Sequence, residues 1–115
     1  KVSAPSVRHT MHTPTSNHEY LFLLSKTNSY HYDADLPTVW EIPEEQEVVA
    51  SISDYATFPT ALVEPCVKAG SWAGDIVLDP FAGSGMTGHV AQRLGRKFIG
   101  IELNPFSAEL AKQMI

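Results

Sequence analysis

Two carboxylates and a glycine-rich turn are the residues best suited to chemistry. Asp79 is followed by Pro80, Phe81 and the string G-S-G-M-T-G of residues 83–88, and Glu102 comes after the next apolar run. The string fits the G-x-G-x-x-G pattern that holds a pyrophosphate at the start of a helix in dinucleotide-binding proteins. In those proteins the first glycine follows the strand directly, whereas here the Asp79 carboxylate would repel a phosphate. We therefore expect the turn to bind a ligand with a cationic end.

S-adenosylmethionine has such an end, because its methionine ammonium lies close to a sulfonium, and it carries no phosphate. The glycines let the backbone approach the ligand, and the helix N-terminus with the Ser84 and Thr87 hydroxyls suits its carboxylate. Glu102 is placed to accept hydrogen bonds from both ribose hydroxyls. The alternative is that Asp79 only caps a turn and that Glu102 is an exposed strand end.

Alternating helices and strands position these residues. The expected order is a helix over 59–69, a strand over 75–79, the glycine turn, a helix over 87–94, a strand over 97–102 and a helix capped by Asn104 and Pro105. Two strands joined through a helix form a parallel pair with a right-handed crossover. Ligands bind at the carboxyl ends of such strands, where Asp79 and Glu102 both lie. The predicted fold class is α/β, with a mostly parallel sheet and flanking helices.

The whole chain divides into four predicted segments. They are a polar leader over 1–18, a strand buried on both faces over 19–26, a connector or short recognition region over 27–53, and a cofactor-binding part over 54–115. The leader carries basic residues and histidines without any acidic residue, so it is either solvated or in contact with a nucleic-acid backbone.

Composition limits the class of protein. The chain has 115 residues, a formal charge of −5 and 43% hydrophobic residues, which suits one modest core and leaves only local contact with DNA. Its longest apolar run, residues 21–24, is too short to span a membrane, and Cys66 has no cysteine partner. We expect a cytoplasmic protein with no membrane partner. His9 and His12 lack a second ligand pair, so no metal site is expected.

The sequence around the turn resembles the DNA amino-methyltransferases, which methylate N6 of adenine or N4 of cytosine. D-P-F-A-G-S-G-M-T of residues 79–87 is similar to that family's D-P-F-x-G-S-G-T-T motif. The likeness covers nearly the whole chain. Further matching segments are F-I-G-I-E-L-N-P (98–105), Y-A-T-F-P (55–59), S-N-H-E-Y-L-F-L-L-S-K (16–26), Y-H-Y-D (30–33) and V-W-E-I-P (39–43).

The resemblance implies a partial Rossmann-like class I methyltransferase fold with S-adenosylmethionine as cofactor. The residues that it assigns to cofactor binding are Asp79, Phe81, Gly83, Ser84, Gly85, Thr87, Glu102 and Leu103, with Thr57, Phe58 and Pro59 closing over the ligand. Met86 stands where a threonine is usual, which removes one hydroxyl from the expected site. The cofactor motif lies late in the chain, as in the circularly permuted members, so the catalytic motif is expected upstream of Lys1.

The family's catalytic segment contains a Pro-Pro pair, and this chain has none. No catalytic residue is therefore expected here, and the chain alone is expected to be inactive. A missing N-terminal half and double-stranded DNA are the expected partners of the full enzyme. Two alternatives stay open: a fragment of an NAD-binding oxidoreductase, supported by the literal glycine string, and a truncated remnant that acts as a binding module.

Overall fold

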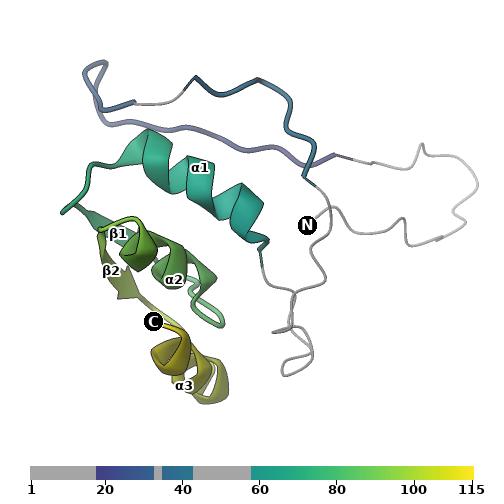
Figure 1. Ribbon diagram of the computed structural model, residues 1–115, viewed down its shortest axis with the longest axis vertical. Helices are drawn as coiled ribbons and strands as arrows, with labels where there is room; N and C mark the ends of the chain where they lie inside the picture. Colours follow the sequence, from purple (N-terminus) through teal and green to yellow (C-terminus); the bar gives the residue numbers. More distant parts are fainter. Residues whose placement is uncertain (1–17, 33–34, 43–57) are drawn as a thin grey trace, which may run out of the picture.

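The computed structural model describes residues 18–32, 35–42 and 58–115. Its helices and strands follow the order α1 (Thr60–Gly70), β1 (Ile76–Asp79), α2 (Met86–Arg93), β2 (Lys97–Gly100) and α3 (Pro105–Met114), shown in Figure 1. The order predicted from the sequence is confirmed, with element ends that differ by one or two residues.

β1 and β2 form a two-stranded parallel sheet within the described residues. Ile76 lies opposite Lys97, and Asp79 lies opposite Gly100. α2 connects the two strands, packs against both of them and lies between α1 and α3 (Figure 1). The α/β class with a parallel sheet and flanking helices is therefore confirmed.

The core lies between α1 and α2. Val63 and Val67 of α1 are buried against Met86 and Val90 of α2, and Val77 of β1 packs against this cluster. Helical spacing on α1 brings the two valines to one face, as the sequence predicts. No helix of the described residues is long and apolar enough to cross a membrane.

The helix ends use the residues that the sequence indicates. Asn104 caps α3, because its side-chain oxygen accepts hydrogen bonds from the N–H groups of Phe106 (2.9 Å) and Ser107 (3.4 Å), and Pro105 occupies the first turn. Gly95, with a φ of 77°, ends α2 in the left-handed conformation that glycine favours.

Arg96 joins the end of α1 to the start of β2. Its guanidinium donates to the Ser71 hydroxyl (3.2 Å), to the Ser71 carbonyl (2.6 Å) and to the Leu94 carbonyl (2.7 Å). The Ser71 hydroxyl in turn donates to the Val67 carbonyl at 2.5 Å. One side chain thus satisfies carbonyls at the ends of two helices.

Replacing Arg96 by alanine is expected to lower the free energy of unfolding by roughly 1.5–3 kcal/mol, because charge-assisted hydrogen bonds are lost and carbonyls are left without donors. Urea denaturation measures the change. Arg93→Ala is the control, since Arg93 pairs with Glu64 on the surface and its loss should cost much less. Equal effects of the two substitutions would contradict the role given to Arg96.

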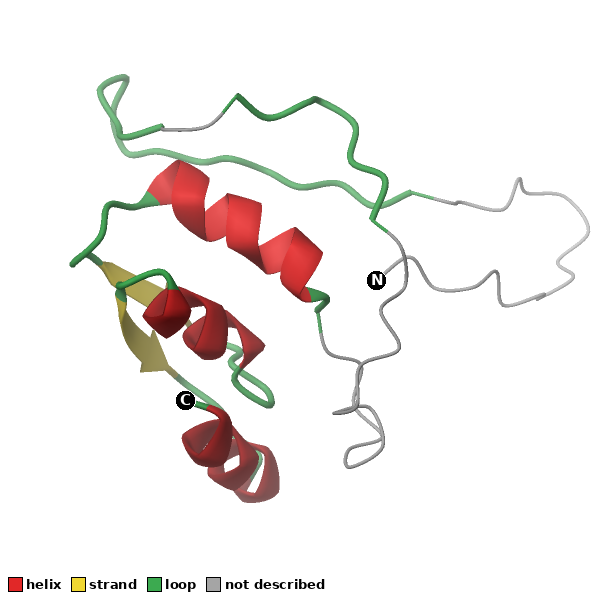
Figure 2. Cartoon of the chain, viewed as in Figure 1, coloured by secondary structure: helices red, strands yellow, loops and turns green. Residues whose placement is uncertain are grey.

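The strand expected over residues 19–26 is not found. The segment is a loop with every residue exposed; Phe22 is 81% and Leu24 is 87% accessible (Figure 2). A strand is buried only when other strands and helices cover it, and no described strand lies beside this one. This segment meets the helical part through Leu21, which borders α1. The connector meets it through His31, whose tilted ring packs against Trp72 with 3.8 Å between centroids.

The other predicted segments can be compared only in part. Residues 27–32 and 35–42 of the connector are loop, and most of the polar leader lies outside the described residues. All described helices and strands belong to the part of the chain over 54–115.

Candidate functional site

The glycine turn folds back onto the end of β2. The N–H of Ile101 donates to the carbonyl of Asp79 (2.9 Å), and the N–H of Ala82 donates to the carbonyl of Ile101 (2.9 Å). These bonds continue the parallel pairing past the strand ends. They place Asp79 and Glu102, the two carboxylates expected at the site, at the same end of the sheet.

Glu102 holds two segments together. Its Oε2 accepts a hydrogen bond from the N–H of Gly83 at 2.8 Å, and its Oε1 accepts one from the N–H of Asn104 at 2.7 Å. The side chain is half-buried. The alternative that Glu102 is merely an exposed strand end is therefore wrong. Each carboxylate oxygen can still accept a second hydrogen bond.

Asp79 caps the turn that follows it, as one alternative foresaw. Its Oδ1 accepts a hydrogen bond from the N–H of Phe81 at 2.9 Å. Among residues 18–32, 35–42 and 58–115, no hydrogen bond reaches its Oδ2. The carboxylate thus fixes the turn with one oxygen.

The three glycines of the turn serve different needs. Gly83 has a φ of 54°, and a Cβ there would meet no atom within 4 Å. Gly85 has a φ of 91°, and a Cβ would lie 2.9 Å from the Cβ of Ala111 on α3. A Cβ at Gly88 would lie 2.6 Å from the Phe98 ring. Gly85 and Gly88 are therefore required by packing against α3 and β2, a reason that the sequence pattern alone did not supply.

Gly88→Ala is expected to destabilise the fold by about 1–3 kcal/mol, because the new methyl group overpacks the contact with Phe98 and Ile115. Thermal or urea unfolding measures the loss. Gly70→Ala is a matched control: Gly70 lies in α1, and a methyl group added there would meet no atom within 4 Å, so no loss is expected. A Gly88→Ala protein as stable as Gly70→Ala would contradict the packing role.

The glycine turn leads directly into the N-terminus of α2. Gly85 is the N-cap, and no side chain caps the helix there. Ser84 is buried at 7% exposure and Thr87 is half-buried in the first turn. Uncapped N–H groups and the helix dipole favour an anionic group at this position.

Met86 is the first residue of α2, and its side chain is buried. It is 7% exposed, belongs to the core cluster of α1 and α2, and its sulfur lies 3.9 Å from the Thr60 hydroxyl oxygen. The expectation that its departure from the family motif removes a hydroxyl from the site is not supported, because the side chain at this position fills the core.

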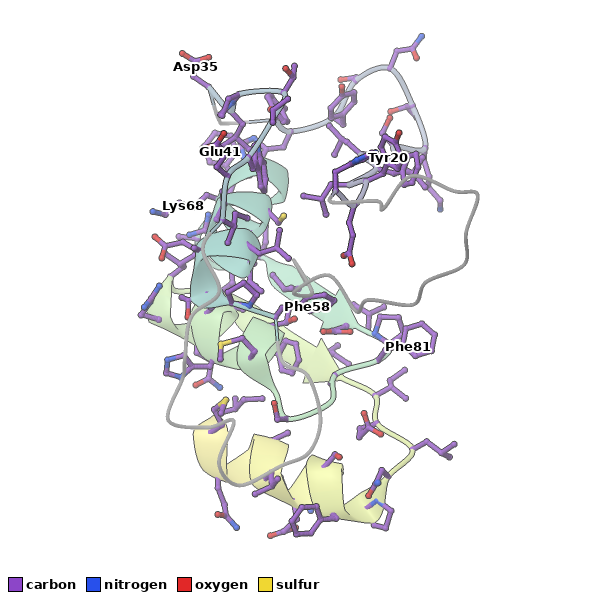
Figure 3. The ribbon with its side chains drawn as sticks, turned by 90° about the vertical axis from the view of Figure 1, so that its right-hand side faces the viewer. Tyr20, Asp35, Glu41, Phe58, Lys68 and Phe81 are labelled. Carbon is purple, nitrogen blue, oxygen red and sulfur yellow. The ribbon has the colours of Figure 1, made fainter. Side chains whose placement is uncertain are left out.

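Two exposed apolar residues, Phe81 and Leu103, lie close in sequence to the two carboxylates. Phe81 is 86% exposed and projects away from the end of β1 (Figure 3), and Leu103 is 98% exposed. Phe58 is half exposed and precedes Pro59, which is the N-cap of α1. Thr57 lies outside the described residues. Exposed aromatic and aliphatic groups beside charged groups suit a ligand with a flat apolar part.

An apolar groove of about 370 Å³ runs between α1 and β1. Phe58 and Thr87 line the end near the turn, and Leu62, Cys66, Ile76 and Val77 line the rest. The partial enclosure raises the pKa of the Cys66 thiol above its ordinary value, although the residue is exposed rather than buried in the core as its helical position suggests. The sequence did not reveal this groove. The sequence gives one indication of the groove, because the segment of α1 has more apolar residues than its contact with α2 buries.

Comparison with known proteins gives a consistent result. A family model described as DNA methylase matches residues 3–113. The type II methyltransferase M.SmaI of Serratia marcescens is 47% identical over 117 aligned positions, which cover 89% of this chain and 39% of that protein. The type II methyltransferase M.Cfr9I of Citrobacter freundii is 40% identical over 111 positions, covering 85% and 36%.

Among solved structures, the cytosine-N4-specific PvuII DNA methyltransferase superposes with a TM-score of 0.62 at 27% identity, over 70% of this chain and 32% of that one. The chain thus spans less than two fifths of the length of these relatives.

Proposed function

Because this chain belongs to the DNA methylase family, we propose that it binds S-adenosylmethionine and forms the cofactor-binding part of a DNA methyltransferase. The enzyme would act on the exocyclic amine of adenine (N6) or cytosine (N4) in double-stranded DNA. The observation that carries the proposal is the Glu102 carboxylate, which the glycine turn holds at the end of β2 with acceptor capacity to spare.

The charges of the site match the parts of this cofactor. The free Oδ2 of Asp79 suits the methionine ammonium, and the N-terminus of α2 with Ser84 and Thr87 suits the carboxylate. The remaining lone pairs of Glu102 suit the ribose hydroxyls. Leu103, which follows Glu102 and is 98% exposed, would contact the adenine ring. Phe81 and Gly83 lie next to this turn. Gly85 allows the turn to adopt its shape, because it packs closely against Ala111 of α3.

The α1 end of the site would close over the cofactor. Phe58 lines the groove together with Thr87, which supports a place for Phe58 and Pro59 beside the methionine part. The role of Thr57, which lies outside the described residues, stays a prediction. When bound, S-adenosylmethionine supplies a methyl group on a positively charged sulfur. Nothing in the cofactor requires an enzyme nucleophile, because the amine of a flipped-out base can attack the methyl carbon itself.

The role of this chain is to bind and orient the cofactor. The family's Pro-Pro catalytic segment is not in its sequence, so the groups that hold the target amine would come from the remaining part of the enzyme. We therefore expect this chain to bind the cofactor without transferring its methyl group.

Isothermal titration of the 115-residue chain tests the cofactor. Heat of binding is expected with S-adenosylmethionine and not with NAD. The nicotinamide alternative would require a pyrophosphate beside the Asp79 carboxylate, which like-charge repulsion disfavours. Binding of NAD alone would overturn the proposal, and binding of neither ligand by the folded chain would favour the interpretation as a remnant that acts as a binding module.

A further inference from the structure

We propose that Met86 is a positioning residue, which sets where the N-terminus of α1 lies relative to the N-terminus of α2. The inference rests on the proposed function, because both helix starts carry residues that are proposed above to hold the cofactor. The side chain of Met86 is buried in the core between the two helices. It therefore acts on cofactor affinity through the position of α1 and not through contact with the ligand.

The side chain of Met86 joins the first residues of the two helices. Met86 is the first residue of α2, and its sulfur lies 3.9 Å from the hydroxyl oxygen of Thr60, the first residue of α1. Further along α1, Val63 belongs to the same buried cluster as Met86. A thioether is only a weak hydrogen-bond acceptor, so Met86 stabilises this contact mainly by filling the space between the helices.

Residues of the proposed site lie on both sides of this contact. Phe58 and Pro59 directly precede α1, while Ser84 and Thr87 lie within two residues of Met86 along the chain. Phe58 and Thr87 line the same end of the apolar groove, so the two helix starts bring them together. A change in the distance between these helix starts therefore changes the shape of the proposed site.

Neither of the two helix starts is fixed by a side-chain cap. Pro59 is the N-cap of α1 and Gly85 is the N-cap of α2, and no side chain makes a capping hydrogen bond at either. The start of α2 is fixed by α3 instead, because a Cβ at Gly85 would lie only 2.9 Å from the Cβ of Ala111. Among the described elements, α1 packs chiefly on α2. The position of its first turn therefore depends on the side chains between the two helices.

An ion pair also joins α1 to α2, but at the far end of α2. Arg93, the last residue of α2, donates a hydrogen bond to the carboxylate of Glu64. Both side chains are partly exposed, at 48% and 30%, and ion pairs in contact with solvent contribute little to stability. The ion pair thus leaves the alignment of the two helix starts to the buried side chain of Met86.

Titration of S-adenosylmethionine into variants of the 115-residue chain tests the inference. Met86→Ala opens a void at the start of both helices, and we expect the dissociation constant to rise about tenfold, because the binding-competent arrangement becomes a minor population. Val67→Ala is the matched control, since Val67 belongs to the same cluster and is 6% exposed against 7% for Met86. It lies away from the helix starts, so its dissociation constant should change by less than about twofold while the chain loses stability.

A conservative variant separates packing from a general loss of stability. Met86→Leu keeps the side-chain volume, so it should keep the affinity of the original chain. Circular dichroism checks that each variant folds, and Met86→Val takes the place of Met86→Ala if the alanine variant does not. Equal affinities of the truncated Met86 variant and Val67→Ala would overturn the inference. A loss of affinity in Met86→Leu as large as that in the truncated variant would overturn it as well.

Amide hydrogen exchange without any ligand separates the inference from the proposed function. The N–H of Val63 donates to the carbonyl of Pro59 at 3.3 Å, so its exchange rate reports on the first turn of α1. At urea concentrations that give the two variants equal stability, this proton should exchange about tenfold faster in Met86→Ala than in Val67→Ala, because local opening is favoured only in the first. If the original chain binds no S-adenosylmethionine, the proposed function fails, and equal exchange rates would then overturn the inference too. Binding by the original chain with equal affinities of the two variants contradicts the inference alone.

Discussion

Double-stranded DNA incubated with the 115-residue chain and S-adenosylmethionine labelled in the methyl group is expected to acquire no label above the protein-free background. In the proposed function, Asp79 and Glu102 would supply acceptors for the cofactor, and the N-terminus of α2 would face its carboxylate. In the DNA amino-methyltransferases, the segment that holds the target amine contains a Pro-Pro pair. This sequence contains no such pair.

An intact relative such as M.SmaI, assayed on the same DNA, shows that the conditions support transfer. The titration with S-adenosylmethionine shows in parallel that the chain is folded and binds its cofactor, so that a negative result reports on catalysis alone. If DNA acquires label and Glu102→Ala removes it, this chain carries its own catalytic group. The proposal that the chain only binds and orients the cofactor would then be wrong.

Glu102→Ala is expected to weaken S-adenosylmethionine binding by about ten- to a hundredfold. Loss of a charge-assisted hydrogen bond costs roughly 1.5–3 kcal/mol, and each 1.4 kcal/mol is a factor of about ten in affinity. The same substitution leaves the N–H groups of Gly83 and Asn104 without their acceptor, so the glycine turn should loosen as well. Calorimetric titration measures the affinity, and urea denaturation measures the change in stability.

Two further variants separate these effects. Glu102→Gln keeps the shape and one acceptor oxygen but removes the charge, so it should retain more stability than Glu102→Ala while losing affinity. Glu109→Ala removes an exposed carboxylate of α3 that pairs with Lys112, and should change neither quantity much. An unchanged affinity in folded Glu102→Ala protein would show that the carboxylate does not hold the ribose.

Local patterns explain why the second half of the chain could be predicted. Asn104 and Pro105 are residues typical of a helix N-terminus, and Gly95 is typical of a helix end. The apolar run before Asp79 indicates a strand from its own residues alone. The position of Asp79 and Glu102 then follows from the rule that parallel strands end on the same side. These are properties of short windows, which the sequence contains in full.

Contacts between distant segments explain what could not be predicted. The sequence pattern does not show that Gly85 and Gly88 also pack against α3 and Phe98, or that the Met86 side chain belongs to the core between α1 and α2. The apolar run over residues 19–26 reads as a buried strand, but burial depends on neighbours that no described residue provides. The apolar pattern of a segment shows which side chains it could bury. Whether they are buried depends on the elements that pack against the segment.

The bonds from Glu102 to the N–H groups of Gly83 and Asn104 have a kinetic consequence. They fix the glycine turn in its shape before any ligand arrives, so the entropy of ordering it is lost during folding and not during binding. Association then needs no loop rearrangement at this turn, and its rate depends on diffusion and on the charges that guide the ligand in. For the cofactor binding proposed above, preorganisation by a single carboxylate would therefore let the turn bind its ligand without first changing shape.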